Sequence, residues 1–574
     1  MRFALALLLS VVAGCAPCDP ADPTCAESTE PDWSRDATLP EDGHRANIYG
    51  LDDQALADAR RRGLLAAASW PVDVSGVYIP HNPLRVILEE DSEDSTVQTG
   101  RELARVFLGF ESMEELFAWV GPPVIDAATE AAPGAPLTPY TSPLPDGFGP
   151  GDRLGVSYVD TEHGSGLTFS CASCHASRLL GRTVIGMANK RSRANEFFDF
   201  GKGVVAIADP EFLRELGDAT DGEVAMLEQA AVRLPAVGNK TPETLGLDTS
   251  LAQVALSLAR RAEDEHATRT WQTEGSPRPN ALEDFVADSK PMPFWTLKYK
   301  TRWLSDGSIV SGNPVHTNFL WNELGRGTDL PELAAWLDDN DEAVRDLTAA
   351  VFASEAPRWT DFFPAESIDL AEAQAGQELF DALCARCHGS YDKGWDTDDA
   401  SSRSPVGLLA NVALDYPAQT EVHDVGTDPQ RADGMQHFAD RLNALDISQE
   451  IATVVEPQTG YVPPPLDGIW ARYPYLHNNS VPSLCALLTP SAERPTTFVQ
   501  GPSESADDFD ADCVGYPVGE AIPAAWLEEE GATYEVGGPG MSNAGHDEWL
   551  TDADGAPTLS PEDRDALIAF LKTL

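Results

Sequence analysis

The sequence predicts a mainly α-helical fold, and three observations carry that prediction. Apolar residues recur at the three- and four-residue spacing of amphipathic helices in several long segments. The pattern Cys-x-x-Cys-His occurs twice, at 171–175 and 384–388, and its second copy directly follows a helical segment. Proline and glycine, with 44 and 45 residues, are abundant and indicate long loops around the helical units.

The N-terminus is typical of an exported protein. Arg2 precedes an apolar run at 3–12 that is too short to span a bilayer as a mature helix and has the form of a signal-peptide core. The run ends in Val-Ala-Gly-Cys, which resembles a bacterial lipobox, although an ordinary signal peptide cut nearby is the alternative. We expect a lipoprotein signal peptide at 1–14 and an outer-membrane lipoprotein, facing the periplasm or the cell surface, whose only membrane contact is a lipid on Cys15.

Charge and composition bound the partners. Residues 15–50 are polar, acidic and rich in proline, which predicts a flexible tether. The chain of 574 residues has 39 Lys and Arg against 93 Asp and Glu, a formal net charge of −54. Such a surface repels polyanions, so we expect no nucleic-acid partner.

The globular part begins at residue 51 with helical and loop segments in alternation. The apolar spacing predicts helices at 51–69, 100–120, 209–217, 224–234 and 251–266. Loops are expected in the Pro/Gly-rich stretch 122–151 and in Gly-Ser-Gly-Leu-Thr-Phe-Ser at 164–170, just before the first Cys-x-x-Cys-His pattern.

The two Cys-x-x-Cys-His patterns are typical of covalent attachment of c-type haem. Each thiol adds to one vinyl group of the porphyrin, and the adjacent histidine is delivered to the iron. Zinc binding is the alternative, but it needs a second ligand pair within a few tens of residues, and neither pattern is followed by one. We therefore predict two covalently bound c-type haems. Their attachment sites are Cys171 and Cys174, with His175 on the iron, and Cys384 and Cys387, with His388 on the iron.

A second compact unit is expected at 366–574, after an N-terminal haem unit with its extension at 51–365. The helix predicted at 368–390 runs into the second Cys-x-x-Cys-His pattern, and another helix, at 559–574, closes the chain. This order resembles the class I cytochromes c, in which the two helices cross and hold the haem beneath them. The fold class is therefore mainly α, with two class I cytochrome-c-like haem domains, long loops and an N-terminal helical extension.

The closing helix carries a complete start signal. Ser560 is placed as the N-cap, Pro561 as the first helical residue and Asp563 as the acid three residues after the cap. We expect the hydroxyl and the carboxylate to satisfy backbone N–H groups reciprocally.

For the sixth ligand of the second haem, the loop before the closing helix offers the favoured candidate. His546 lies in this loop, and Met541 in the same loop is the alternative; His546 could also be a solvated loop histidine. His477 has aromatic and apolar flanks, so we expect it to be buried near the haem edge as a ligand, a propionate contact or a structural donor.

For the first haem, the informative feature is an absence. No histidine occurs from Ala176 to Asp264, and Met187 is the only early candidate; His316 is a later alternative. A haem iron without a protein sixth ligand is open to peroxide or dioxygen. The first haem is therefore the expected reaction site and the second the expected electron store.

The four cysteines assigned neither to the lipid nor to the haems could form two pairs. Of nine cysteines, one is assigned to the lipid and four to the haems. In an oxidising compartment, Cys18 and Cys25, and Cys485 and Cys513, are expected to form disulfides.

Three segments give a family resemblance: Pro-Phe-Trp-Thr-Leu-Lys-Tyr-Lys at 293–300, Val-Gly-Thr-Asp-Pro-Gln-Arg-Ala-Asp-Gly-Met at 425–435, and the proline- and tyrosine-rich run at 463–484. With the two haem motifs, they resemble the bacterial di-haem cytochrome c peroxidase superfamily and are most similar to the rubber oxygenase subgroup. The resemblance implies haems that communicate across the domain interface. Trp295 matches the family's inter-haem tryptophan, although a plain core residue is the alternative, and His546 matches the distal histidine of the oxygenase subgroup.

The chain also departs from both relatives. The peroxidases carry a distal histidine shortly after their first haem, and this chain has none. Unlike the oxygenase, the chain is acidic, has the lipobox and offers no assignable hydrophobic tunnel. The expected function is a di-haem oxidoreductase that uses peroxide or dioxygen and receives electrons from a redox partner protein or a small donor. A non-catalytic electron-transfer cytochrome and a catalytically silent binding protein are the alternatives.

Overall fold

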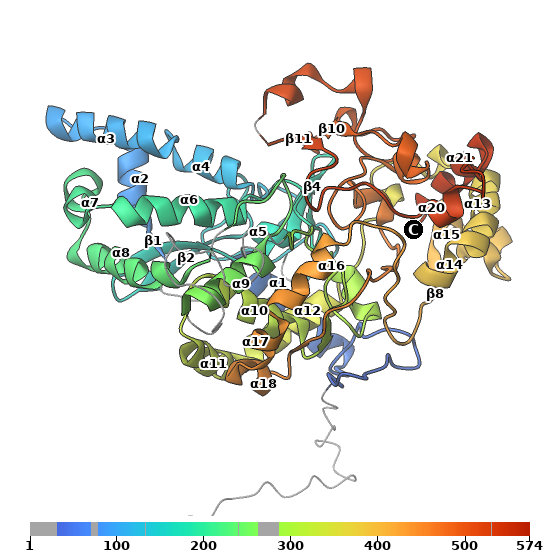
Figure 1. Cartoon of the computed structure of the whole chain (residues 1–574), viewed down its shortest axis with the longest axis horizontal. Coiled ribbons are helices and arrows are strands. Elements are labelled where there is room, and N and C mark those ends of the chain that lie inside the picture. The colour runs from blue at the N-terminus through green and yellow to red at the C-terminus, as the bar shows by residue number, and fades with distance from the viewer. Residues whose placement is uncertain (1–30, 70–77, 133, 239, 262–285, 530) are drawn as a thin grey trace, which may run out of the picture.

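The computed structural model describes residues 31–69, 78–132, 134–238, 240–261, 286–529 and 531–574 (Figure 1). The expected signal peptide, the lipid site Cys15 and the pair Cys18 and Cys25 lie outside these residues. None of the helices within the described ranges is long and apolar enough to cross a membrane.

The first predicted helix is confirmed as α1 (Asp53–Ser69), which packs along α12 (Asp341–Phe352). Gly63 permits this contact, because a Cβ there would lie 2.1 Å from the carbonyl oxygen of Asp346. Arg62 Nη2 donates to Asp346 Oδ1 at 2.8 Å and joins the same two helices.

The single helix predicted at 100–120 is wrong, because the structure has two. They are α3 (Ser95–Leu108) and α4 (Met113–Val120). Gly109 adopts a left-handed φ of 78° and ends the first, and the Ser112 side chain caps the second by accepting from the N–H of Glu115. Apolar periodicity continues across this break, so the periodicity alone did not reveal it.

Four further helices accompany a small sheet at one end of the molecule (Figure 1). The helices are α2 (His81–Glu89), α6 (Ala194–Ile207), α7 (Pro210–Gly217) and α8 (Asp221–Arg233). The sheet has the antiparallel order β1-β3-β2, with β1 (Ile79–Pro80), β2 (Val156–Thr161) and β3 (Gly164–Phe169).

The strand β3 corrects the loop expected before the first haem motif. Thr161 pairs with Gly164 and Val156 with Phe169, so β2 and β3 form a tight hairpin. Two glycines and a serine in β3 weaken the apolar alternation that would have predicted a strand. The first haem motif then begins directly after an ordered strand.

The middle of the chain forms the first large core. It contains α9 (Ser250–Arg261), α10 (Pro314–Gly325), α11 (Leu330–Asp339) and the short 3₁₀ helix η4 (Phe294–Tyr299). The described part of the helix predicted at 251–266 is α9. The pair β6 (Ile309–Ser311) and β9 (Val454–Val455) ties this region to the later chain.

The C-terminal helices pack closely against each other beside the second motif. Helix α13 (Leu370–Leu383) runs into the one-turn helix α14 (Ala385–His388), and α21 (Pro561–Leu571) packs across α13. A Cβ at Gly376 would lie 1.9 Å from the carbonyl oxygen of Ala566, so the two helices meet backbone to backbone. The expected crossing of these helices is present.

The predicted start of α21 is confirmed in detail. The Ser560 side chain accepts from the N–H of Asp563 at 3.1 Å, and the Asp563 carboxylate accepts from the N–H of Ser560 at 3.1 Å. Pro561 is the first helical residue. This is the reciprocal capping box that the sequence predicts.

The remaining helices and strands are short and are spread over both parts of the chain. They are β4 (Ala176–Leu179), β5 (Arg182–Ile185), β7 (Ser390–Lys393), β8 (Asn411–Asp415), α15 (Pro405–Leu409), α16 (Gln430–Gly434), α17 (Ala439–Asn443), α18 (Asp446–Glu450), α19 (Leu484–Leu487), β10 (Thr497–Val499), β11 (Thr533–Glu535) and α20 (Asp547–Leu550). Cys485 and Cys513 form the predicted disulfide, with Cα atoms 4.9 Å apart.

The two main cores do not follow the domain boundary expected at 365/366. Phe438 and Leu442 pack with α9, α10 and α12 in the first core. Leu179, Val184 and Trp295 pack with α13 and α21 in the second core. Each core therefore draws residues from both sides of that boundary.

Candidate functional site

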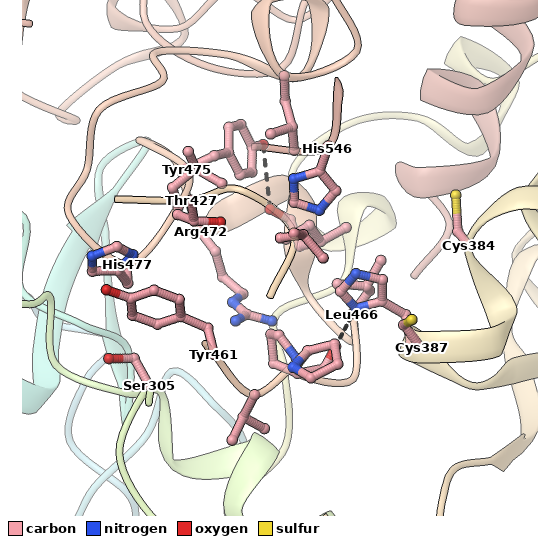
Figure 2. A pocket seen from close by; sticks show the side chains of 18 of the residues that line it. Ser305, Cys384, Cys387, Thr427, Tyr461, Leu466, Arg472, Tyr475, His477 and His546 are labelled. Carbon is pink, nitrogen blue, oxygen red and sulfur yellow. Dashed lines mark hydrogen bonds between the residues drawn. The ribbon is translucent and has the colours of Figure 1, made fainter. Parts of the chain in front are cut away.

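A cavity of about 250 Å³ surrounds the second Cys-x-x-Cys-His motif. In Figure 2, Cys384 and Cys387 lie at one end of it and His477 at the other, with His546 and Arg472 between them. The wall is otherwise mostly apolar, with side chains such as Phe380, Leu383, Leu466, Leu484, Leu567 and Leu571. Several of these come from α13 and α21, so the cavity lies against the crossing helices.

The imidazole of His388 is oriented by the backbone. Its Nδ1 lies 2.7 Å from the carbonyl oxygen of Pro464, which can only accept, so Nδ1 carries the proton. The lone pair is then on Nε2, the atom left for a metal. Burial lowers the pKa of His388 to about 4, against the opposing effect of the Pro464 carbonyl, so the ring is neutral at neutral pH. A neutral imidazole is the form that ligates iron.

His546 contributes a second imidazole to the same cavity. It precedes α20, has a left-handed φ of 68°, and its Nδ1 is buried without a hydrogen-bond partner among the described residues. Burial, and to a smaller extent the nearby His388, lower the pKa of His546 to about 3. The alternative ligand Met541 is buried in the second core and does not line the cavity.

His477 is buried in the cavity wall, as expected from its flanks. Its ring stacks on Tyr461 with centroids 4.0 Å apart and an interplanar angle of 18°. Its Nδ1 has no hydrogen-bond partner in the described part of the chain, and its carbonyl oxygen accepts from the N–H of Lys290. The stack holds the ring in place but does not by itself assign a role.

A second cavity, of about 140 Å³, contains part of the first motif. Cys171 and His175 line it, whereas Cys174 Sγ lies 3.7 Å from Ser192 Oγ. Burial lowers the pKa of His175 to about 4, opposed mainly by the negative charge of Asp248. The imidazole packs against Phe294 with ring centroids 4.8 Å apart.

One histidine and one methionine line this second cavity. Among the residues that the structure describes, His175 is its only histidine. The sequence candidates Met187 and His316 do not line it. Met187 packs in the second core, and burial lowers the pKa of His316, opposed by Asp341 and Asp338. The methionine in the wall is Met292, which directly precedes the run at 293–300 and belongs to no motif.

None of the four motif cysteines forms a disulfide, and Cys171 and Cys384 pack against the hydrophobic cores. Burial raises the pKa of Cys384 and of Cys174 to about 12, and that of Cys171 to about 11. A zinc site needs thiolates and further ligands. Within the described ranges, no group of three or more His, Cys, Asp or Glu side chains is arranged to hold a metal ion. The donor set therefore fits thioether attachment with a single histidine better than zinc.

The two cavities share a wall. Residues 289–292 and Ser305 line both of them. Trp295 follows three residues after this segment, is fully buried and lines neither cavity. Its indole Nε1 donates to the carbonyl oxygen of Asp467 at 2.9 Å. Trp295 therefore packs in the second core, outside both cavity walls.

A comparison with known protein families supports a relationship with cytochromes c. Residues 460–499 match the family model described as RoxA-like, cytochrome c-like. This stretch includes Pro464, the partner of His388, and His477. The match supports a relationship with RoxA-like cytochromes c and, with it, covalently bound haem.

Two curated relatives from Sinorhizobium fredii (strain NBRC 101917 / NGR234) match part of the chain. Uncharacterized protein y4iJ is 32% identical over 259 residues, which cover 38% of this chain and 41% of the relative. Uncharacterized protein y4iM is 31% identical over 223 residues, which cover 36% of this chain and 49% of the relative. The chain therefore spans less than half the length of either relative.

Proposed function

We propose that the chain is a di-haem c-type cytochrome oxidoreductase related to the di-haem peroxidase superfamily. One haem is attached at Cys171 and Cys174 and the other at Cys384 and Cys387, each in a class I cytochrome-c-like domain. A haem with an open sixth position supplies iron that can bind peroxide or dioxygen. One observation carries the proposal: the second cavity imidazole, His546, is present only at the C-terminal site.

At the C-terminal site, the chain supplies two neutral imidazoles. His388 is held with its Nε2 free by the Pro464 carbonyl, and His546 lies in the same cavity. Two imidazoles on one iron leave no position for a diatomic ligand, which suits an electron store. At the N-terminal site, His175 is the one imidazole among the described lining residues, so a haem held there would have an iron that could bind peroxide or dioxygen.

Covalent and hydrogen bonds support an electron route between the sites. From His388, the hydrogen bond to Pro464 enters a backbone segment that reaches Asp467, whose carbonyl accepts from Trp295. Trp295 is bonded to Phe294, and the Phe294 ring lies against the imidazole of His175. The one step that is neither a covalent bond nor a hydrogen bond is the contact between the rings of Phe294 and His175, with centroids 4.8 Å apart. This continuity supports a relay role for Trp295.

The partners and location follow from the sequence expectations. We propose a redox partner protein or a small molecule as electron donor, and the net charge of −54 favours a basic one. We also propose that Cys15 carries the lipid that tethers the protein to the outer membrane, in the periplasm or at the cell surface.

A second candidate, a non-catalytic electron-transfer cytochrome, is favoured by one observation. Met292 lines the cavity of the first motif, and methionine is a common sixth ligand in cytochromes c. Ligation by Met292 would close the first haem and remove the reaction site.

Carbon monoxide binding to the reduced protein separates these two functions. The pyridine haemochrome assay should first give two haems per chain. We then expect carbon monoxide to bind one haem per chain, at Cys171 and Cys174, and the oxidised protein to show one high-spin and one low-spin signal by electron paramagnetic resonance. Binding at both haems would contradict the assignment of His546. No binding, with two low-spin signals, would establish the electron carrier.

A further inference from the structure

Several cationic side chains lie around the two cavities with no ion pair to any described carboxylate. Lys300 is 1% exposed, and the sulfur of Met292, 4.0 Å from its Nζ, is its one polar contact in the described residues. Lys290 Nζ donates to the carbonyl oxygens of Arg472 and Pro474. Arg472 Nη1 likewise donates to a carbonyl, that of Pro465 at 2.9 Å. Each of these groups has neutral acceptors in place of a counter-charge.

Such an arrangement is unusual in a chain with 93 acidic residues. Lys240, another buried lysine, is paired with Asp288 at 3.0 Å. For Lys290 and Lys300, burial lowers the pKa well below its usual value, and the next contribution is the repulsion of Arg472. An ammonium group buried without a counter-charge costs several kcal/mol. The three cations therefore point to an anionic group that the chain itself does not supply.

The positions of the cations relative to the cavities are specific. Lys300 and Arg472 line the cavity of Cys384 and Cys387 but not that of Cys171. Lys290 belongs to the shared wall and lines both cavities. Haem carries a pair of propionate carboxylates, and ammonium or guanidinium groups form strong charge-assisted hydrogen bonds with carboxylates.

We propose that Lys290, Lys300 and Arg472 bind the propionates of the C-terminal haem, and that Lys290 is a counter-charge shared by both haems. This inference rests on the proposed function, because it requires a haem in each cavity. It gives the shared wall a role of its own: a single lysine couples the electrostatics of the two sites. Lys290 and Lys300 are two of the three lysines at 290–300, between the haem motifs.

A nearby positive charge favours the reduced iron, which carries one positive charge fewer than the oxidised iron. Replacing Lys290 by Met should therefore lower the reduction potentials of both haems. Replacing Lys300 by Met should lower that of the C-terminal haem alone, because Lys300 lines only that cavity. We expect about a tenfold shift of the reduction equilibrium in each case, which is about 59 mV for a one-electron couple. Lys290→Arg keeps the charge and should leave both potentials close to those of the unchanged protein.

Lys298 provides the matched control. It lies two residues from Lys300, donates to the carbonyl oxygen of Ser354 at 3.1 Å and lines neither cavity. Lys298→Met removes the same charge from the same segment. Because Lys298 lines neither cavity, this variant should shift the reduction potentials less than Lys300→Met does.

The experiment is a spectroelectrochemical titration of the purified two-haem protein and its variants. A fall of both potentials in Lys290→Met, and of the C-terminal one alone in Lys300→Met, supports the proposal. Equal shifts in Lys300→Met and Lys298→Met overturn it. Should Lys290→Met fail to accumulate with haem, the comparison of Lys300→Met with Lys298→Met decides alone. The haem count and the carbon monoxide stoichiometry of the unchanged protein test the proposed function separately, since neither depends on these lysines.

Discussion

The Nδ1 atom of His388 lies 2.7 Å from the carbonyl oxygen of Pro464. This contact joins the second haem motif to the segment that matches the RoxA-like cytochrome model. It also continues, through the backbone, to the acceptor of the Trp295 indole. One hydrogen bond thus orients the proposed iron ligand and begins the proposed route to the other site.

Replacing His388 by Ala should remove the ligand of the second iron without removing the thioether sites Cys384 and Cys387. We expect the low-spin signal to be lost while the haem stays covalently attached, as measured by electron paramagnetic resonance and haem-stained gels. His423→Ala is the control, because His423 lines the same cavity but its Nε2 pairs with Glu421 at 2.8 Å. An unchanged low-spin signal in His388→Ala would show that the iron ligand is a different residue.

Replacing His546 by Ala should open a second carbon monoxide site. With the imidazole removed, the iron beside His388 has a free position, so binding should rise from one to two haems per chain. His477→Ala tests the competing imidazole of the same cavity. If His477→Ala opens the site and His546→Ala does not, the two histidines have exchanged roles and our assignment is wrong.

The sequence predicts the parts of this molecule that are determined by neighbours along the chain. The capping box of Ser560 and Asp563 and the helix that runs into Cys384 follow from local patterns, and both are present. The Cys485–Cys513 disulfide follows from counting the cysteines that the haem motifs leave over.

The sequence did not predict features that depend on segments far apart. The wall shared by the two cavities combines residues 289–292 with Ser305, and its methionine, Met292, belongs to no motif. Likewise, Phe438 packs in the core of the N-terminal helices although it lies beyond the second haem motif. Long-range packing of this kind leaves no periodic signal in a single sequence.

Trp295 should be tested with Phe, because the side chain is fully buried. Trp→Ala in a core costs about 3–5 kcal/mol and would confuse unfolding with loss of electron transfer. Trp295→Phe keeps most of the volume but removes the hydrogen bond to Asp467. We expect slower electron transfer between the haems, measured by rapid-mixing spectroscopy, with a stability loss of about 1–2 kcal/mol.

Trp470→Phe is the control for this experiment. Trp470 is equally buried, lies in the same core, donates to the carbonyl oxygen of Pro357 at 2.9 Å and lines neither cavity. Similar slowing in both variants would mean that Trp295 acts only through packing.

The disulfide between Cys485 and Cys513 should stabilise the C-terminal unit. It closes a loop with a sequence separation of 28 residues, for which the chain-entropy estimate is about 3–4 kcal/mol. The double variant Cys485→Ser, Cys513→Ser should lose stability by about that amount in denaturant unfolding while the haem count stays at two. A loss of attached haem would instead mean that the pairing directs maturation of the site.

The close crossing of α13 and α21 should make Gly376 intolerant of any side chain. A Cβ there would lie 1.9 Å from the carbonyl oxygen of Ala566 and 2.9 Å from the Cβ of Phe570, so the helices must separate. We expect Gly376→Ala to reduce the free energy of unfolding by about 3 kcal/mol. It should also broaden the spectrum of the C-terminal haem, because residues of the same two helices line its cavity.

Gly201→Ala is the matched control: Gly201 lies within helix α6 with no atom within 4 Å of its added Cβ. Since alanine favours helix over glycine by about 1 kcal/mol, that variant should be as stable as the unchanged protein or more so. Denaturant titration followed by far-ultraviolet circular dichroism and by the haem absorption measures both effects. Equal stability of the two variants would show that α13 and α21 do not meet at Gly376.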